Sequence, residues 1–166
     1  MTGGDRTIVR AGALVAVPWA NGGGVTRIIA ERPGAFRLSL ATIADAGPFS
    51  LFPGFTRVFA LVSGRVDLTG QSGTLDARSA PVMFSGDEPM AAALPDGTAL
   101  ALNLMVPDGA PRLAMVRHSG DGHHDALAIF ACAPVVVDGT VALDIHDTMV
   151  CNGVVRVAGC ALVVVR

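Results

Sequence analysis

The charged residues of this chain are of the wrong kind for helices. All 12 basic residues are arginine, and 12 of the 14 acidic residues are aspartate. Exposed helix faces are normally filled by Glu, Lys and Gln, and this chain offers only Glu31, Glu88 and Gln71. Its 20 Gly and 10 Pro residues, together with many Val, Thr and Ile, favour short strands and frequent turns. The composition therefore predicts a predominantly β fold.

Apolar runs of strand length, separated by Gly or Pro, occur at 25–30, 36–43, 57–62 and 65–69. The turn sequences Ser63-Gly64 and Pro95-Asp96-Gly97 each lie between two such runs, which predicts tight antiparallel hairpins. A Pro/Gly-rich break at 107–111 is followed by further strand-like runs that are apolar on both faces. We therefore expect a first half over 1–109 and a second β-rich half over 110–166, packed as one compact unit.

Several classes of partner are not indicated. The net charge is −2 and no basic run occurs, so no nucleic-acid partner is expected. No segment approaches the roughly 18 consecutive apolar residues of a membrane span, so no membrane partner is expected either. The cysteines are odd in number, lack CxxC spacing and have apolar neighbours in the sequence, as is typical of free thiols in a reducing compartment. These features predict a cytoplasmic protein.

Five short motifs, in this order and spacing, resemble the HutD/Ves family of bacterial proteins. They read PWANGGGVT at 18–26, FRLSLA at 36–41, GPFSLFPG at 47–54, FSGD at 84–87 and LNLM at 102–105. The resemblance implies a cupin-type (RmlC-like) β-sandwich or barrel, with a doubled, bicupin arrangement in one chain as an option. It also implies a role near histidine degradation, without a demonstrated reaction. The chain departs from the usual family residues at Ala20, Ile28, Phe36 and Thr56.

The metal-binding motifs of cupins can be laid on this chain by using Gly64 and Gly86 as anchors. The glutamate slot of the first motif then falls on Arg57, and its histidine slots fall on Ser50 and Phe52. In the second motif the two ligand slots fall on Pro89 and Ala93. None of these side chains replaces a metal ligand, so we expect neither a metal nor another cofactor.

Arg57 is instead suited to an anion, because a guanidinium binds a carboxylate through two parallel hydrogen bonds. Strand alternation places Arg57 on one face with Phe59, and Arg37 on one face with Ser39. The alternatives are a strand cap or a surface ion pair for Arg57, and a salt bridge to an aspartate for Arg37. The predicted ligand-binding residues are Arg57, Arg37, Ser39, Asn21, Phe49 and Phe52.

The glycine run at 22–24 has two interpretations. Its backbone N–H groups could form an anion-binding nest, or the run could be a turn before a strand. The turn is favoured, because no Lys-Ser/Thr pair follows the glycines.

Four histidines remain as candidates for acid–base chemistry. A structural role is favoured for them, and no catalytic residue is assigned. They are His118, His123, His124 and His146.

The leading hypothesis is a metal-free cupin-like binding protein for a small carboxylate metabolite, with a regulatory or buffering role linked to histidine utilisation. Urocanate and formylglutamate are the candidate ligands by resemblance. The alternative is a cupin-fold isomerase or hydrolase acting on a small carboxylate, with His146 or another group as general base. A third interpretation, an interaction protein, predicts a homodimer through the apolar C-terminal strands; cupins commonly associate through their sheets, so a dimer also fits the binding protein.

Overall fold

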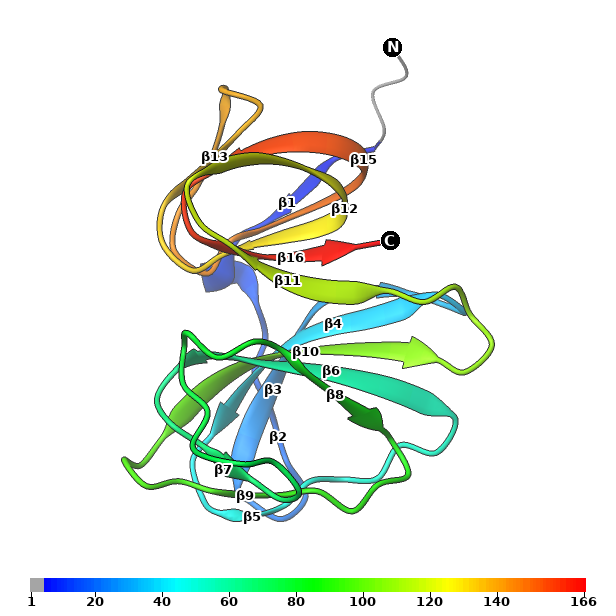
Figure 1. The fold of residues 1–166 in the computed structure, drawn as a ribbon, viewed down its shortest axis with the longest axis vertical. Coiled ribbons are helices and arrows are strands. Elements are labelled where there is room, and N and C mark those ends of the chain that lie inside the picture. The colour runs from blue at the N-terminus through cyan, green and yellow to red at the C-terminus, as the bar shows by residue number, and fades with distance from the viewer. Residues whose placement is uncertain (1–4) are drawn as a thin grey trace. The chain divides into compact units, whose positions relative to one another are not determined.

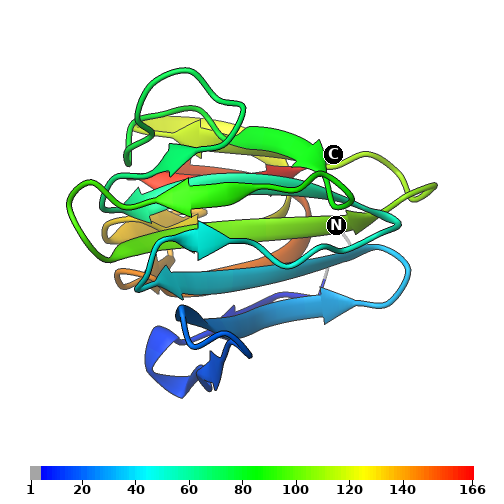
Figure 2. The ribbon, with the colours of Figure 1, turned by 90° about the horizontal axis from the view of Figure 1, so that it is seen from below.

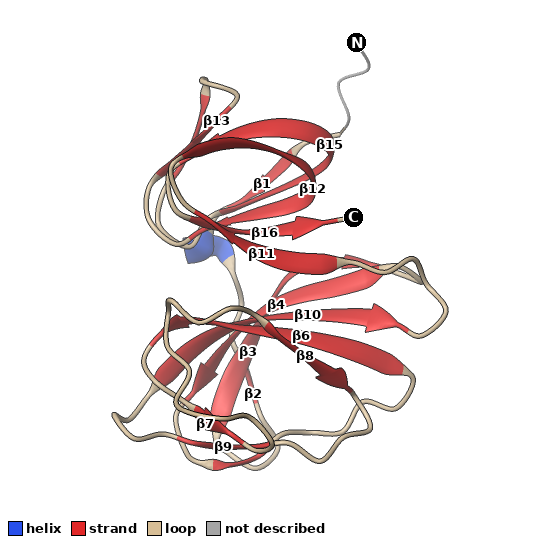
Figure 3. Ribbon diagram, viewed as in Figure 1, coloured by secondary structure: helices blue, strands red, loops and turns tan. Residues whose placement is uncertain are grey.

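A computed structural model describes residues 5–166 (Figures 1 and 3). Strands joined by turns make up the fold, and the one helical element in this range is a single 3-10 turn, η1 (Ala11–Ala13). The predicted all-β class is therefore confirmed. Across the same residues, the structure contains no helix of the length and apolarity that a membrane crossing requires.

The chain divides into two compact units. The central unit is Val15–Ala110, and the terminal unit combines residues 5–14 with Pro111–Arg166. The N-terminal strand β1 (Thr7–Val9) pairs with β15 (Thr148–Ala158), and Arg10 forms an ion pair with the buried Asp147 at 2.5 Å. Sequence patterning did not indicate this pairing, because a three-residue strand carries no feature that identifies its partner.

The central unit is built on a six-stranded antiparallel sheet. Its strands are β2 (Val17–Pro18), β3 (Gly24–Arg32), β4 (Phe36–Ile43), β6 (Phe55–Ser63), β8 (Val82–Ser85) and β10 (Ala99–Pro107). The strand order is β2-β3-β4-β10-β6-β8. Figure 2 shows these strands lying side by side, with the blue β2 at one edge next to β3. The neighbouring inner strands β4, β10 and β6 alternate residues between two faces, which is what positions the site described below.

A second sheet in the same unit contains three short strands in the order β5-β9-β7. They are β5 (Gly47–Pro48), β7 (Asp67–Leu68) and β9 (Ala91–Ala93). Apolar side chains of the two sheets share one core, in which Phe59 and Leu61 of β6 lie in the same cluster as Leu68 and Ala92. Residues of the two sheets thus exclude water together, as in a sandwich.

The two predicted hairpins are wrong. Strand β6 pairs with β8 and β10, whereas β7 after Ser63-Gly64 pairs with β9 of the other sheet. Likewise β9 and β10, on either side of Pro95-Asp96-Gly97, belong to different sheets. Both turns are therefore corners between sheets. At Gly64, which has φ +81°, a Cβ would lie 2.8 Å from the Ala99 Cα, so the corner requires glycine.

The terminal unit forms a seven-stranded sheet with the order β11-β16-β12-β15-β13-β14, and β1 pairs with β15. Its remaining strands are β11 (Ala114–His118), β12 (Asp121–Ala131), β13 (Val135–Val137), β14 (Val141–Leu143) and β16 (Ala161–Val165). A register shift between Ala126 and Ala128 interrupts the pairing of β12. Buried side chains of five strands, among them Val, Ala and Leu, form a core within the terminal unit.

Candidate functional site

Three neighbouring strands of the central unit present polar side chains on one face. Arg57 of β6 and Arg37 of β4 are both cross-strand partners of Met105 on β10. One row along, Ser39 and Phe59 are both partners of Asn103. Directly opposite residues in an antiparallel sheet share a face, so the predicted sharing of faces by Arg57 and Phe59, and by Arg37 and Ser39, is confirmed.

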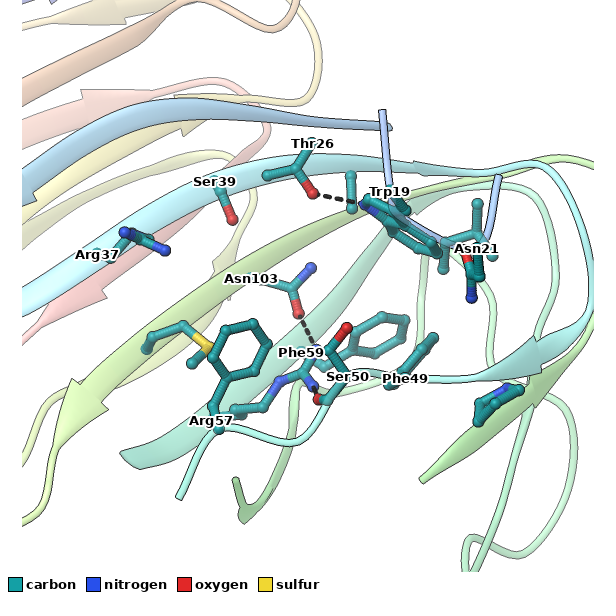
Figure 4. Close-up of a pocket in the computed structure, with 15 residues that line it drawn as sticks. Trp19, Asn21, Thr26, Arg37, Ser39, Phe49, Ser50, Arg57, Phe59 and Asn103 are labelled. Atoms are coloured by element: carbon teal, nitrogen blue, oxygen red, sulfur yellow. Dashed lines mark hydrogen bonds between the residues drawn. The ribbon is translucent and has the colours of Figure 1, made fainter. Parts of the chain in front are cut away.

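These residues line a cavity of about 140 Å³, which we call the Arg57 cavity (Figure 4). The structure brings all six residues of the sequence-based set to its wall. They are Arg57, Arg37, Ser39, Asn21, Phe49 and Phe52. Their role in binding a ligand stays a prediction.

Arg57 is the most buried charged group of the Arg57 cavity, with 8% of its surface exposed. Its Nη1 donates to the Ser50 carbonyl at 3.2 Å and its Nη2 donates to the Asn103 Oδ1 at 3.3 Å. Its Nε is buried without a hydrogen-bond partner. Aromatic rings hold the guanidinium carbon within cation–π range, at 5.2 Å from the centroid of Phe49 and 5.6 Å from that of Phe52.

No carboxylate of residues 5–166 forms an ion pair with Arg57. Its polar partners are a backbone carbonyl and a neutral amide, which solvate the cation less well than water does. Burial therefore lowers the pKa of Arg57 to about 10. The guanidinium is still charged at neutral pH, so the Arg57 cavity holds an uncompensated positive charge.

Arg37 differs from Arg57 both in its burial and in the pairing of its charge. Its side chain is 41% exposed, and its Nη2 lies 3.0 Å from the Oε1 of Glu31, its cross-strand partner on β3. A salt bridge for Arg37 was one of the two sequence-based alternatives, and the structure supplies it with a glutamate rather than an aspartate. Arg37 thus lies at one end of the Arg57 cavity with its charge already paired (Figure 4).

The aromatic wall comes from the loop between β5 and β6, which two backbone contacts fix in place. Phe49 N–H donates to the Met90 carbonyl and Phe52 N–H donates to the Gly86 carbonyl, both at 2.8 Å. Gly86 N–H in turn donates to Phe55. A Cβ on Gly86 would lie 2.0 Å from the Phe52 carbonyl oxygen, so only glycine permits this approach.

The glycine run forms a turn, as favoured from the sequence. Gly22 N–H donates to the Trp19 carbonyl at 3.0 Å, and Gly23 N–H donates to the Asn21 Oδ1 at 2.9 Å. These two N–H groups are therefore not available to an anion. Trp19 Nε1 donates to the Thr26 Oγ1 at 2.8 Å, which holds the indole against the Arg57 cavity (Figure 4).

The donor set of the Arg57 cavity does not fit a cupin metal. Ser50, Phe52 and Arg57, the residues at the first motif's ligand slots, all line it. Its wall contains no Asp, Glu, His or Cys, whereas a transition metal requires several converging N, O or S donors. Elsewhere in residues 5–166, no group of three such side chains converges.

The candidate histidines lie in the terminal unit. His146 has φ +67° and stacks on Phe130 at 5.6 Å, and burial lowers its pKa. The His124 Nε2 lies 3.0 Å from the His118 Nδ1, and the His118 Nε2 lies 3.0 Å from the Val157 carbonyl. None of these imidazoles lines the Arg57 cavity.

Sequence reasoning did not assign Asn103. It lies in the LNLM motif, but nothing marked its side chain as facing Arg57. The signal was present: Asn103 is a single polar residue within the apolar strand β10, and a buried polar side chain needs a partner.

Comparisons with known proteins agree on one family. A family model described as HutD matches residues 11–158. Protein Ves from Citrobacter koseri is 41% identical over 96 residues, which is 52% of this chain and 50% of that protein. An uncharacterised 21.2 kDa protein in the hutC 3' region of Pseudomonas putida is 31% identical over 107 residues, which is 59% of this chain and 56% of that protein. The chain spans about half the length of the curated relatives it matches.

Solved structures extend the likeness to the whole fold. HutD from Pseudomonas fluorescens SBW25, in a formate condition, has a TM-score of 0.83 and 27% identity, covering 96% of this chain and 97% of that chain. A conserved protein of unknown function from Pseudomonas aeruginosa PAO1 has a TM-score of 0.78 and 28% identity, covering 98% and 100%. Ylba from Escherichia coli, at 10% identity and a TM-score of 0.71 over 98% and 90%, shares the fold alone.

Proposed function

Because the chain belongs to the HutD family and has a cupin-type β fold, we propose that it is a metal-free binding protein for a small carboxylate metabolite. Its role would be regulatory or buffering and linked to histidine utilisation. A homodimer and a cytoplasmic location belong to the same proposal.

The charge of Arg57 carries this proposal. The guanidinium is buried at a cavity wall, and no carboxylate of residues 5–166 compensates it. A buried charge without a counter-ion is costly, so an anion that enters the Arg57 cavity gains a favourable interaction that water does not match. A carboxylate is the anion whose geometry suits a guanidinium in such a confined site.

The other walls restrict the size and chemistry of the ligand. At about 140 Å³ the Arg57 cavity is smaller than the roughly 300–1,000 Å³ of sites for drug-sized ligands. Phe49, Phe52 and Phe59 provide apolar surface. The amide of Asn103 lies beside Arg57, and Ser39 adds a hydroxyl on the far side of Asn103 (Figure 4). These features favour a small carboxylate with one further polar group.

The link to histidine utilisation rests on the relatives. One relative is described by its position in the hutC 3' region of Pseudomonas putida. Urocanate and formylglutamate, both small carboxylates, are therefore the ligands to test first.

An enzymatic role is the alternative, and the residues that line the Arg57 cavity favour it less than a binding role. General acid–base catalysis needs a titratable group near the reacting atoms, and the Arg57 cavity is lined by arginines but by no Asp, Glu, His or Cys. His146, the base suggested from the sequence, packs on Phe130 in the terminal unit.

Isothermal titration of the chelator-treated full chain with urocanate and formylglutamate tests the proposal. We expect one of them to bind, and Arg57→Gln to weaken that binding about 100-fold or more, because a buried charged hydrogen bond is lost. Arg65→Gln is the matched control: this arginine is exposed, pairs with Asp96 and does not line the Arg57 cavity, so the affinity should change little.

Two results would overturn the proposal. The proposed carboxylate site would be contradicted if neither ligand gave heat on titration. It would also be contradicted if a folded Arg57→Gln variant bound the ligand as tightly as the wild type. If chromatography shows that the metal-free protein consumes either compound, the result would favour the enzyme.

A further inference from the structure

Cys132 and Cys160 lie opposite each other at the end of two paired strands. The register of β12 and β16 pairs Phe130 with Leu162 and Ala131 with Ala161. One residue further along each strand are Cys132 and Cys160, and the Cys132 N–H donates to the Cys160 carbonyl at 3.0 Å. The two thiols, 28 positions apart in the sequence, are therefore cross-strand neighbours.

This placement brings the side chains within reach of a disulfide. Opposite residues of an antiparallel pair have Cα atoms about 4.5–5.5 Å apart, and a disulfide spans about 4.4–6.8 Å between Cα atoms. Both cysteines lie just outside the bounds of their strands, β12 ending at Ala131 and β16 beginning at Ala161. A bridge between them therefore breaks no strand pairing.

The corner that carries Cys160 is held in place. Gly159 N–H donates to the Gly120 carbonyl at 2.7 Å, and Gly159 has φ +131°. A Cβ on Gly159 would lie 2.9 Å from the Pro134 carbonyl oxygen, so this close approach requires glycine. The backbone thus keeps Cys160 beside Cys132 before any bond forms.

The thiols of Cys132 and Cys160 differ in their exposure to solvent. Cys160 is exposed, whereas Cys132 is partly buried. Burial raises the pKa of the Cys132 thiol, and the positive charge of Arg117 opposes that effect. The interaction with Cys160 raises the pKa of Cys132 further, which is consistent with their proximity. An oxidant in solution therefore meets Cys160 first.

The third cysteine is placed differently. Cys151 is 1% exposed, and its Sγ lies 3.4 Å from the Ala126 carbonyl oxygen. It provides an internal control, because a buried thiol reacts slowly with oxidants in solution.

We propose that Cys132 and Cys160 form a reversible redox site that closes to an intramolecular disulfide in the presence of a peroxide. The Cys160 thiolate attacks one peroxide oxygen, so an S–O bond forms, the O–O bond breaks and the first water leaves after protonation. The Cys132 thiolate then attacks the Cys160 sulfenic acid, so the S–S bond forms, the S–O bond breaks and the second water leaves. The two thiols lose two electrons and two protons, and hydrogen peroxide is reduced to two waters.

The bridge would close a loop containing β13, β14 and β15, and a thiol reductant would reopen it. Restricting that loop in the unfolded chain raises stability. The site lies within the terminal unit, whereas the Arg57 cavity lies within the central unit. The inference therefore goes beyond the proposed function and does not rest on it.

Peptide mapping of the peroxide-treated full chain tests this site. Trypsin cuts after Arg117 and Arg156, which places Cys132 and Cys151 on peptide 118–156 and Cys160 on peptide 157–166. We expect a monomer lighter by about 2 Da, with these two peptides joined until a reductant is added. The joined peptides should persist in Cys151→Ala and disappear in Cys132→Ser and in Cys160→Ser.

Thermal unfolding supplies a second readout. The oxidised protein should melt several degrees above the reduced protein, and Cys132→Ser should show no such difference. Disulfide-linked dimers through Cys160, sulfinic acid on Cys160 without a link, or a link that requires Cys151 would each overturn the proposal.

Discussion

Arg57 of β6 and Asn103 of β10 are diagonal neighbours on one face of the sheet, with the arginine Nη2 donating to the amide Oδ1 at 3.3 Å. The amide accepts a hydrogen bond without neutralising the charge. In this arrangement the protein orients the guanidinium and leaves its charge available to a ligand.

Replacing the neutral partner of Arg57 with a charged one should inactivate the site. Asn103→Asp places a carboxylate beside the guanidinium, so we expect binding of formylglutamate to weaken about 10-fold or more while the free protein melts at a higher temperature. Asn103→Ala is the control, because it removes the acceptor without adding charge and should not raise the melting temperature. Titration calorimetry and thermal unfolding measure both effects. Equal ligand affinity in Asn103→Asp and the wild type would contradict this prediction.

Removing the buried charge should stabilise the empty protein. Burial lowers the pKa of Arg57 from its ordinary value to about 10, which corresponds to about 3 kcal/mol of unfavourable burial of the charged form. This cost is present below pH 10 and is relieved as the pH rises through that value. Because Arg57→Met also loses cation–π contacts, we expect a gain of about 1–2 kcal/mol in the free energy of unfolding at pH 7.

Urea denaturation at pH 7 measures the effect of Arg57→Met. Arg37→Met is the control, because that arginine is largely exposed and should change stability by about 0.5 kcal/mol or less. A strongly destabilised Arg57→Met variant would instead mean that the contacts of Arg57 outweigh the cost of its burial.

Binding should be insensitive to pH across the range in which histidines titrate. Arg57 stays charged below pH 10, and no imidazole lines the Arg57 cavity. The affinity for formylglutamate, whose carboxylates titrate near pH 4, should therefore be constant from about pH 6 to 9 and fall as the pH rises through 10. Calorimetry in buffers across this range measures it, and a step near pH 6.5 would implicate a histidine.

Gly86 should be required for the aromatic wall. A Cβ there would lie 2.0 Å from the Phe52 carbonyl oxygen and 2.8 Å from that of Phe55. We expect Gly86→Ala to lower stability by about 1–3 kcal/mol and to weaken binding, because the loop that carries Phe52 must move. Gly12→Ala is the control, since nothing lies within 4 Å of its added Cβ. A Gly86→Ala variant with wild-type stability would contradict the prediction.

Mild acid should destabilise the terminal unit. Burial lowers the pKa of His124, as do His118 and His123, and burial also lowers that of His146. The unfolded chain therefore binds more protons than the folded chain, and stability falls as the pH drops through about 6.5. The melting temperature should decline from pH 8 to pH 5, and the double variant His124→Gln, His146→Gln should flatten that decline. An identical decline in the variant would assign it to other groups.

The sequence predicted well what depends on local chemistry. Alternation placed Arg37 with Ser39 on one face of β4 and Arg57 with Phe59 on one face of β6, and the motif at 47–54 located Phe49 and Phe52. What it missed depends on contacts between distant segments. The turn at Ser63-Gly64 has the chemistry of a hairpin, but which sheet the next strand joins is decided by packing. The proximity of Cys132 to Cys160 likewise follows from the pairing of β12 with β16, which no local pattern encodes.

The pairing of β1 with β15 has a consequence for biosynthesis. Thr7 leaves the ribosome well before its partner Val150, which follows 143 positions later. Every strand of the central unit is made in the meantime, so that unit can complete its sheets first while β1 stays unpaired. Strand β1 is therefore made before the strands of the central unit but paired after them, and a nascent chain arrested before β15 would expose it.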